Sequence, residues 1–207
     1  MITLWHDKTG SAFIEYAIVF PLFISVTLGT VDVTYMLFDW ALANKAAYVG
    51  ARAAVVSDPV ATSATNPLTN PSYTQSQSQQ IGQLCFNPST GVSNGNCPSI
   101  STVCTPNSSS GGSCTNSYTF DNTAFLAILG KMQAVFPRLQ RQNVQISYNT
   151  NGQGFVLQPG GLPMDVTVSV QGMTHRFYFI SGLERVRSTP SIPPFATTLT
   201  SEDMATN

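Results

Sequence analysis

The chain has 207 residues and carries nine Lys and Arg side chains against ten Asp and Glu side chains, a formal net charge of −1. Only 9% of its residues are charged, whereas about 25% is usual in a soluble globular domain. Lys and Arg form no run, so the sequence lacks the clustered basic face that binding to nucleic-acid phosphates requires. We therefore expect no nucleic-acid partner, and the length allows one domain of ordinary size with an appendage.

An apolar segment lies near the N-terminus, between Ala12 and Val31. Its twenty residues carry a single charge, and a helix needs about 20 such residues to cross the hydrocarbon core of a bilayer. The apolar core of a secretory signal peptide is shorter, about 7–15 residues, and ends at a small-residue cleavage site. Here the helical pattern continues to Val56, where an Asp-Pro pair ends it. We predict one helix over 11–56, embedded in the lipid bilayer as far as Val31.

Glu15 is the one charged residue within this apolar segment. An ionised carboxylate inside a membrane costs on the order of 2.5–3.5 kcal/mol or more unless it is paired. Glu15 either lies at the headgroup level, where the dipole of the helix start tolerates an anion, or pairs with a cation that another molecule supplies. No Lys or Arg follows it in the chain before Lys45.

The residues around Glu15 resemble a known processing signal. Gly10 is followed by four residues and then by Glu15 and Tyr16, which is similar to the prepilin-peptidase recognition pattern G-x-x-x-x-E-Y of the Flp/Tad pilins. Residues 38–56 are rich in alanine and contain Gly-Ala-Arg, and they resemble the stretch that follows the membrane helix in TadE-like proteins. Over about residues 8–56 the chain thus resembles a TadE-like minor pilin or pseudopilin of the tight-adherence pilus.

This resemblance implies a maturation and assembly route. Residues 1–10 would be a cytoplasmic leader, and a prepilin peptidase would cut between Gly10 and Ser11. Glu15, with Tyr16 beside it, would then dock on a neighbouring subunit by pairing with the new N-terminal ammonium at Ser11. Many type IV pilins have a methylated Phe where this chain has Ser11, so the resemblance carries no expectation about methylation at this position. The implied partners are the peptidase, other pilin or pseudopilin subunits, the inner-membrane assembly platform and the lipid bilayer.

Residues 57–119 form a polar, almost uncharged segment rich in Ser, Thr and Asn, which is typical of loop rather than core. Its four cysteines allow three disulfide pairings. We favour Cys85–Cys97 and Cys104–Cys114, because each closes a loop of about a dozen residues. A zinc site is the competing interpretation, but its usual C-x₂₋₄-C spacing is absent. Disulfides predict an oxidising compartment, the periplasm or the cell exterior.

Residues 120–187 have the pattern of a folded domain. Asp121 or Asn122 can cap a helix that runs to about Gln133, and Pro137 stops it. Alternating apolar residues then predict four strands, at 144–148, 155–157, 166–170 and 177–179. One helix packed on an antiparallel sheet and joined to a long N-terminal helix is an α+β, pilin-like architecture. Residues 188–207 contain three prolines and are expected to be an extended tail.

Catalytic patterns are absent from the sequence. No phosphate-binding glycine loop, H-E-x-x-H or G-x-S-x-G occurs, so we expect no enzyme, no metal site and no cofactor. His6 lies in the predicted leader, and we expect His175 to be a strand-surface side chain.

Two interpretations of the helix beyond Val31 stay open. Its many small residues between Ala41 and Ala54 would let helices of neighbouring subunits approach closely. Alternatively, one face of the helix contacts this protein's own domain, through Tyr35, Phe38, Trp40 and Leu42. The second interpretation describes a single-pass envelope protein with an extracytoplasmic binding or adhesion domain unrelated to pili. The first predicts a minor pilin of the inner membrane with its C-terminal domain in the periplasm, serving pilus assembly, adhesion or secretion.

Overall fold

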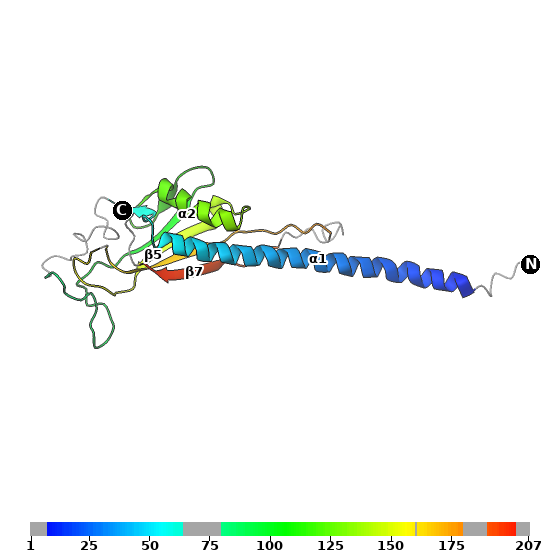
Figure 1. Cartoon of the computed structure of the whole chain (residues 1–207), viewed down its shortest axis with the longest axis horizontal. Helices are drawn as coiled ribbons and strands as arrows, with labels where there is room; N and C mark the ends of the chain where they lie inside the picture. Colours follow the sequence, from blue (N-terminus) through cyan, green and yellow to red (C-terminus); the bar gives the residue numbers. More distant parts are fainter. Residues whose placement is uncertain (1–7, 64–79, 160, 180–189, 202–207) are drawn as a thin grey trace, which may run out of the picture. The chain divides into compact units, whose positions relative to one another are not determined.

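The computed structural model describes residues 8–63, 80–159, 161–179 and 190–201, and the side chains from residue 13 onward. The chain divides into two compact units. One comprises Met1–Trp40 with Thr174–Ser191, and the other comprises Ala41–Met173 with Ile192–Asn207. Figure 1 shows the ribbon, with the long helix in blue to cyan.

Helix α1 spans Lys8–Ala54, 47 residues, which corresponds to about 70 Å at 1.5 Å per residue. The predicted long helix is therefore confirmed, but it begins before Ser11 and ends before Val56. Pro21 lies inside it. Hydroxyl side chains in its apolar part donate hydrogen bonds to carbonyls three or four residues earlier, as Ser25 does to Pro21 at 2.7 Å. These bonds satisfy polar groups within a segment that is otherwise apolar.

The second unit contains a five-stranded antiparallel sheet in the order β3-β2-β5-β6-β7. The strands are β2 (Ser101–Pro106), β3 (Gly112–Cys114), β5 (Val144–Thr150), β6 (Met164–Val170) and β7 (Phe195–Thr200). A separate two-stranded pair joins β1 (Ala61–Thr62) to β4 (Thr119–Phe120), and a 3-10 turn, η2 (Arg141–Asn143), precedes β5. Side chains of β5 and β6 alternate between buried and partly exposed, so one face of the sheet meets the core.

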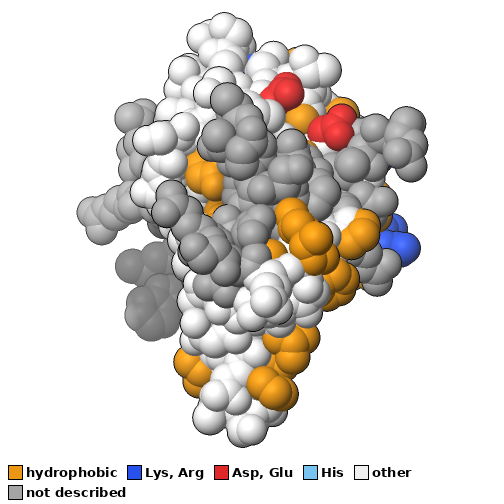
Figure 2. Space-filling model, turned by 90° about the vertical axis from the view of Figure 1, so that its left-hand side faces the viewer, with side chains coloured by type: hydrophobic (Ala, Val, Ile, Leu, Met, Phe, Trp, Pro, Cys, Tyr) orange, Lys and Arg blue, Asp and Glu red, His pale blue; other side chains and the backbone are white. Residues whose placement is uncertain are grey.

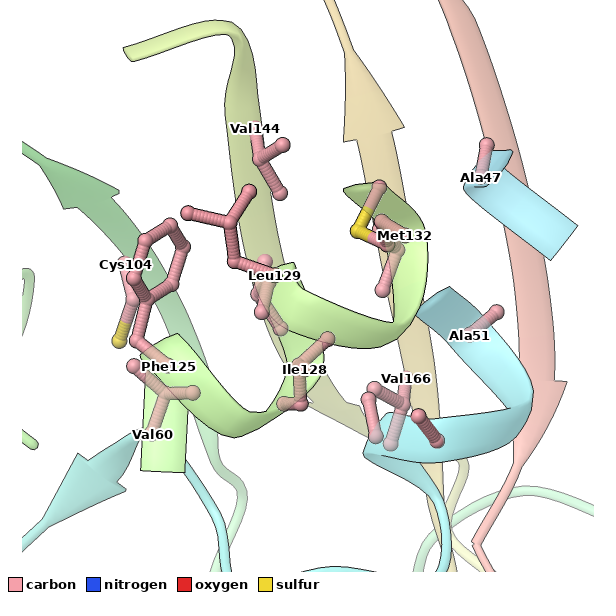
Figure 3. Packing of buried hydrophobic residues seen from close by; sticks show 14 of the residues in the cluster. Ala47, Ala51, Val60, Cys104, Phe125, Ile128, Leu129, Met132, Val144 and Val166 are labelled. Atoms are coloured by element: carbon pink, nitrogen blue, oxygen red, sulfur yellow. The ribbon is translucent and has the colours of Figure 1, made fainter. Parts of the chain in front are cut away.

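Helix α2 (Asn122–Val135) and the last turns of α1 pack against that face. The Asp121 carboxylate caps α2 by accepting the backbone N–H groups of Thr123 at 2.7 Å and Ala124 at 3.1 Å. Figure 3 shows the apolar side chains that meet in this core, contributed by α1, α2 and the sheet: Ala47, Ala51, Phe125, Ile128, Leu129, Met132, Val144 and Val166. The α+β fold predicted from the sequence is confirmed.

Strand assignment from the sequence was wrong in four places. The expected loop over 57–119 contains β2 and β3, and the expected tail over 188–207 contains β7. These strands are rich in Thr and Ser, and their pairing with β5 and β6 supplies the backbone hydrogen bonds that the composition does not reveal. The predicted strands at 155–157 and 177–179 do not form, and Leu157 has a positive φ of 62°, which breaks an extended chain.

Candidate functional site

The predicted processing residues lie at the start of α1. Gly10 and Ser11 fall within its first turn, and their side chains are outside the described part of the chain. Glu15 is exposed, and the described residues provide no cation for it. Tyr16 stacks on Phe20, four residues later on the same side of the helix, with ring centroids 5.3 Å apart. The structure therefore leaves the carboxylate of Glu15 available to a group from another molecule.

The first half of α1 presents apolar side chains outward. Large residues from Phe13 to Val26, among them Ile18 and Leu22, are 36–75% exposed. Over its most apolar window the mean hydropathy is 1.8, and only 6% of that window is buried within the protein. The helix is thus long and apolar enough to cross a membrane. A bilayer or neighbouring subunits would remove this surface from water, which is favourable by about 25 cal/mol per Å².

Immediately after the apolar segment, α1 carries a cluster of buried polar residues that sequence reasoning missed. Asp32 is 0% exposed, and its two carboxylate oxygens accept the backbone N–H groups of Tyr178 at 3.1 Å and Phe179 at 2.8 Å. Two turns later, Oδ2 of Asp39 lies 3.1 Å from Nδ1 of His175. Asp32 and Asp39 are seven residues apart and so share a helix face, which is the one signal in the sequence that pointed to this cluster.

His175 was expected on a strand surface, and this expectation was wrong. Its side chain is 1% exposed, and its ring meets the edge of Phe177 with centroids 5.5 Å apart. The backbone N–H of His175 donates to the carbonyl of Pro190 at 3.1 Å. The physical reason is the Asp39 carboxylate, which gives an imidazole a buried hydrogen-bonding partner that a single-strand pattern cannot indicate. No group of three metal-ligating side chains occurs among the described residues.

The four cysteines form two disulfides in the second unit. Cys85 pairs with Cys97 and Cys104 pairs with Cys114, at sequence separations of 12 and 10. This is the pairing predicted from loop length, and it engages all four cysteines in disulfides. Cys104 and Cys114 lie directly opposite each other on β2 and β3.

The surface around these loops is polar but carries little charge. Figure 2 shows one face of the molecule, on which the described residues display few acidic or basic side chains. A cleft of about 190 Å³ lies beside the Cys85–Cys97 disulfide. One of its polar side chains is already engaged, because Asn151 donates to Asp165 at 3.3 Å and accepts the N–H of Gln153 at 3.0 Å.

The small residues in the second half of α1 pack within this chain. Most of them are buried in the core of the second unit, namely Ala43, Ala46, Ala47, Gly50, Ala51, Ala53 and Ala54. The expectation that they contact helices of neighbouring subunits was wrong, because α2 and the sheet already cover them. Tyr35, Phe38 and Trp40, offered as the alternative intramolecular contacts, are 42–58% exposed. Leu42, the fourth residue of that interpretation, is partly buried and packs against the core, so the helix does pack on its own domain, mainly through alanines.

Comparison with known proteins adds one finding to this geometry. Neither the curated proteins nor the solved structures contain a match to this chain. The family model described as TadE-like protein matches residues 10–52, a range that lies entirely on α1 and includes Gly10, Glu15 and Asp32. This family is associated with the tight-adherence pilus. Over residues 10–52 the chain is therefore similar to the TadE-like family, as the resemblance of its N-terminal segment implied.

Proposed function

We propose that this protein is a minor pilin or pseudopilin of a tight-adherence pilus. Its apolar helix would insert in the inner membrane and its disulfide-bonded domain would fold in the periplasm. The observation that carries the proposal is the family match over 10–52, which lies on α1. The first half of this helix exposes apolar side chains, and its second half is part of the core of a folded domain. Such a subunit takes part in pilus assembly, with adhesion or secretion as the output.

Placement of the domain in the periplasm rests on its cysteines. All described cysteines are in disulfides, which persist in oxidising compartments and are rare in the cytoplasm. The apolar half of α1 precedes both disulfides in the chain, so one crossing of the membrane separates the leader from the domain. The leader would then face the cytoplasm.

The role proposed for Glu15 follows from its surroundings. Cleavage between Gly10 and Ser11 would create an ammonium group at Ser11. The Glu15 carboxylate is exposed among apolar side chains, so in lipid it gains most from a cation that arrives with another subunit. The pair would set the axial position of one subunit against the next.

The test of processing is the N-terminal peptide mass of the membrane-extracted protein, with and without the prepilin peptidase. We expect a start at Ser11 only when the peptidase is present. Gly10→Ala should block the cut, because the added Cβ obstructs approach to the backbone, whereas Gly29→Ala on the same helix should leave it unchanged. A mature protein that keeps Met1 would instead support the single-pass envelope protein.

The test of docking compares Glu15→Ala with Glu15→Asp. Both variants should be cut at the same position, but Glu15→Ala should lose incorporation into pili or into the assembly complex because the carboxylate is gone. Glu15→Asp retains the charge and should recover part of the incorporation. Normal assembly with Glu15→Ala would contradict the pairing while leaving the processing result intact.

A further inference from the structure

The segment Thr174–Phe179, here called the arm, is held against α1 at two points. At its base Thr174 bridges to Ser191, and His175 pairs with Asp39. At its tip, Asp32 accepts both the Tyr178 and the Phe179 N–H groups. Because Asp32 precedes Asp39 by seven residues, the arm runs about 10 Å along the helix, towards the apolar half of α1.

The arm exposes two aromatic side chains and one basic side chain. Tyr178 is 66% exposed and Phe179 is 47% exposed, although their backbone is pinned by a fully buried carboxylate. Arg176, two residues before Tyr178, is also exposed. A cation next to exposed aromatic rings is typical of surfaces that rest in the headgroup region of a membrane, where phosphates attract the cation and rings sit at the boundary.

The position of the tip along α1 matches that boundary. The apolar segment ends at Val31, and its twenty residues span about 30 Å, the thickness of the hydrocarbon core. Asp32 is the next residue, so with residues 12–31 spanning the bilayer the tip would lie where hydrocarbon gives way to headgroups. The carboxylate is tolerated there because two N–H groups satisfy its oxygens. At the same level, α1 itself exposes Tyr35, which lies about 6 Å beyond Val31.

We propose that the arm is a second membrane contact: Tyr178 and Phe179 insert their rings at the headgroup boundary of the bilayer, and Arg176 binds lipid phosphate. The proposal rests on the insertion of α1 that the proposed function includes. Lipid is favoured over a protein partner because the exposed rings lie at the level of α1 where its apolar segment ends, and an exposed cation accompanies them. Asp32 and Asp39 act as positioning residues that hold the arm at this depth.

The experiment measures depth by tryptophan fluorescence. The full chain, with Trp5→Phe and Trp40→Phe to remove background, is reconstituted in vesicles of phosphatidylcholine and phosphatidylglycerol. Three single reporters are compared: Tyr178→Trp on the arm, Phe23→Trp in the apolar helix and Leu126→Trp on the exposed side of α2. Lipids brominated at a shallow or a deep acyl position serve as quenchers. We expect shallow quenching at 178, deep quenching at 23 and none at 126.

The outcomes separate this proposal from the proposed function. Quenching at 23 without quenching at 178 overturns the arm contact and leaves membrane insertion standing. Absence of quenching at 23 overturns insertion and the arm contact together. A photo-crosslinker at 178 that captures a second copy of the chain rather than lipid also overturns the proposal.

A second set of variants tests the positioning role of Asp32. In the Tyr178→Trp background, Asp32→Ala should reduce shallow quenching, because the tip loses its hydrogen bonds to the Asp32 carboxylate. The control is Asp58→Ala, which removes an exposed aspartate beyond α1 and should leave the quenching unchanged. Unchanged quenching with Asp32→Ala overturns the positioning role. Arg176→Ala leaves these hydrogen bonds intact, and it should lower quenching in vesicles that contain phosphatidylglycerol more than in pure phosphatidylcholine.

Discussion

Tyr148 is the largest fully buried side chain of the sheet, and one hydrogen bond explains how its hydroxyl is tolerated there. The hydroxyl accepts the backbone N–H of Val60 at 3.0 Å, which joins β5 to the chain just after α1. Burial raises the pKa of Tyr148 above its ordinary value of 10.0, because the interior disfavours the phenolate. The phenol therefore stays neutral in the folded state at pH values where the unfolded chain ionises.

We predict that Tyr148→Phe lowers the free energy of unfolding by about 1–3 kcal/mol, because the buried N–H of Val60 loses its acceptor. The raised pKa of Tyr148 contributes to the free energy of unfolding, and this contribution is fully present below about pH 10. It is lost as the pH rises above that value, because the unfolded state then binds fewer protons than the folded state. The difference in the free energy of unfolding between the unmodified chain and the Tyr148→Phe variant should therefore become smaller above that pH. Urea unfolding in mild detergent across this range measures both effects, and a difference independent of pH would contradict the second.

Gly50 and Gly130, both within helices, allow a matched pair of substitutions by alanine. A Cβ built on Gly50 of α1 would lie 2.6 Å from Sδ and 2.8 Å from Cγ of Met132, whose side chain is fully buried. On exposed Gly130 of α2, a Cβ meets no atom within 4 Å. We predict that Gly50→Ala destabilises by about 1–3 kcal/mol and that Gly130→Ala stabilises by about 0.5–1 kcal/mol. If the urea unfolding midpoints of the two variants shifted in the same direction, the predicted difference in packing around Gly50 and Gly130 would be contradicted.

At the scale of secondary-structure elements, the two disulfides have different structural roles. Cys104–Cys114 closes the hairpin of β2 and β3, and Cys104 belongs to the main buried cluster. Cys85–Cys97 closes a loop outside that cluster, and the chain at its start contacts residues 154–156, as where the Cys85 N–H donates to the Gly154 carbonyl at 3.0 Å. One disulfide thus supports the sheet and the other shapes a surface loop.

We predict that replacing Cys104 and Cys114 together by Ala lowers the free energy of unfolding by about 3 kcal/mol, because a short loop regains its freedom in the unfolded chain. Replacing Cys85 and Cys97 should mainly speed protease cleavage within 85–97, with a smaller loss of global stability. Urea unfolding and limited proteolysis of both variants make the comparison. Equal losses of global stability would show that the surface loop is part of the cooperative core.

At the scale of the molecule, α1 has two environments along one continuous helix. Its residues from Phe13 to Val31 pack little within the protein, whereas those from Ala43 onward are part of the core of the second unit. On α1, the continuous exposed apolar surface therefore lies in the first half, because the alanines of the second half are already covered. We therefore expect folding of the domain not to depend on the apolar half.

We predict that a chain beginning at Asp32 remains folded without detergent, with a free energy of unfolding within about 0.5 kcal/mol of the full chain, since no core residue is removed. The full chain should require detergent or lipid to stay monodisperse. Size-exclusion chromatography and urea unfolding test both statements. Loss of cooperative unfolding in the shortened chain would show that residues before Asp32 stabilise the domain.

Local patterns were enough to predict several parts of this protein. The twenty-residue apolar segment predicted the exposed half of α1, and Asp121 with Pro137 predicted α2, which ends at Val135. Alternation predicted β5 and β6, because both strands have one buried face. Short loop lengths predicted the disulfide pairing. Each of these signals is contained within a few neighbouring residues, so the sequence by itself determined them.

Only the tertiary structure decided the remaining features, because each depends on partners far apart in the chain. Polar β2 and β7 become strands by pairing with β5 and β6. The alanines of α1 are buried because α2 and the sheet cover them, which no helical pattern distinguishes from a subunit contact. His175 and the arm reach Asp39 and Asp32 across more than 130 residues. Such long-range contacts place the arm beside the helix, where its depth in a membrane becomes a testable property.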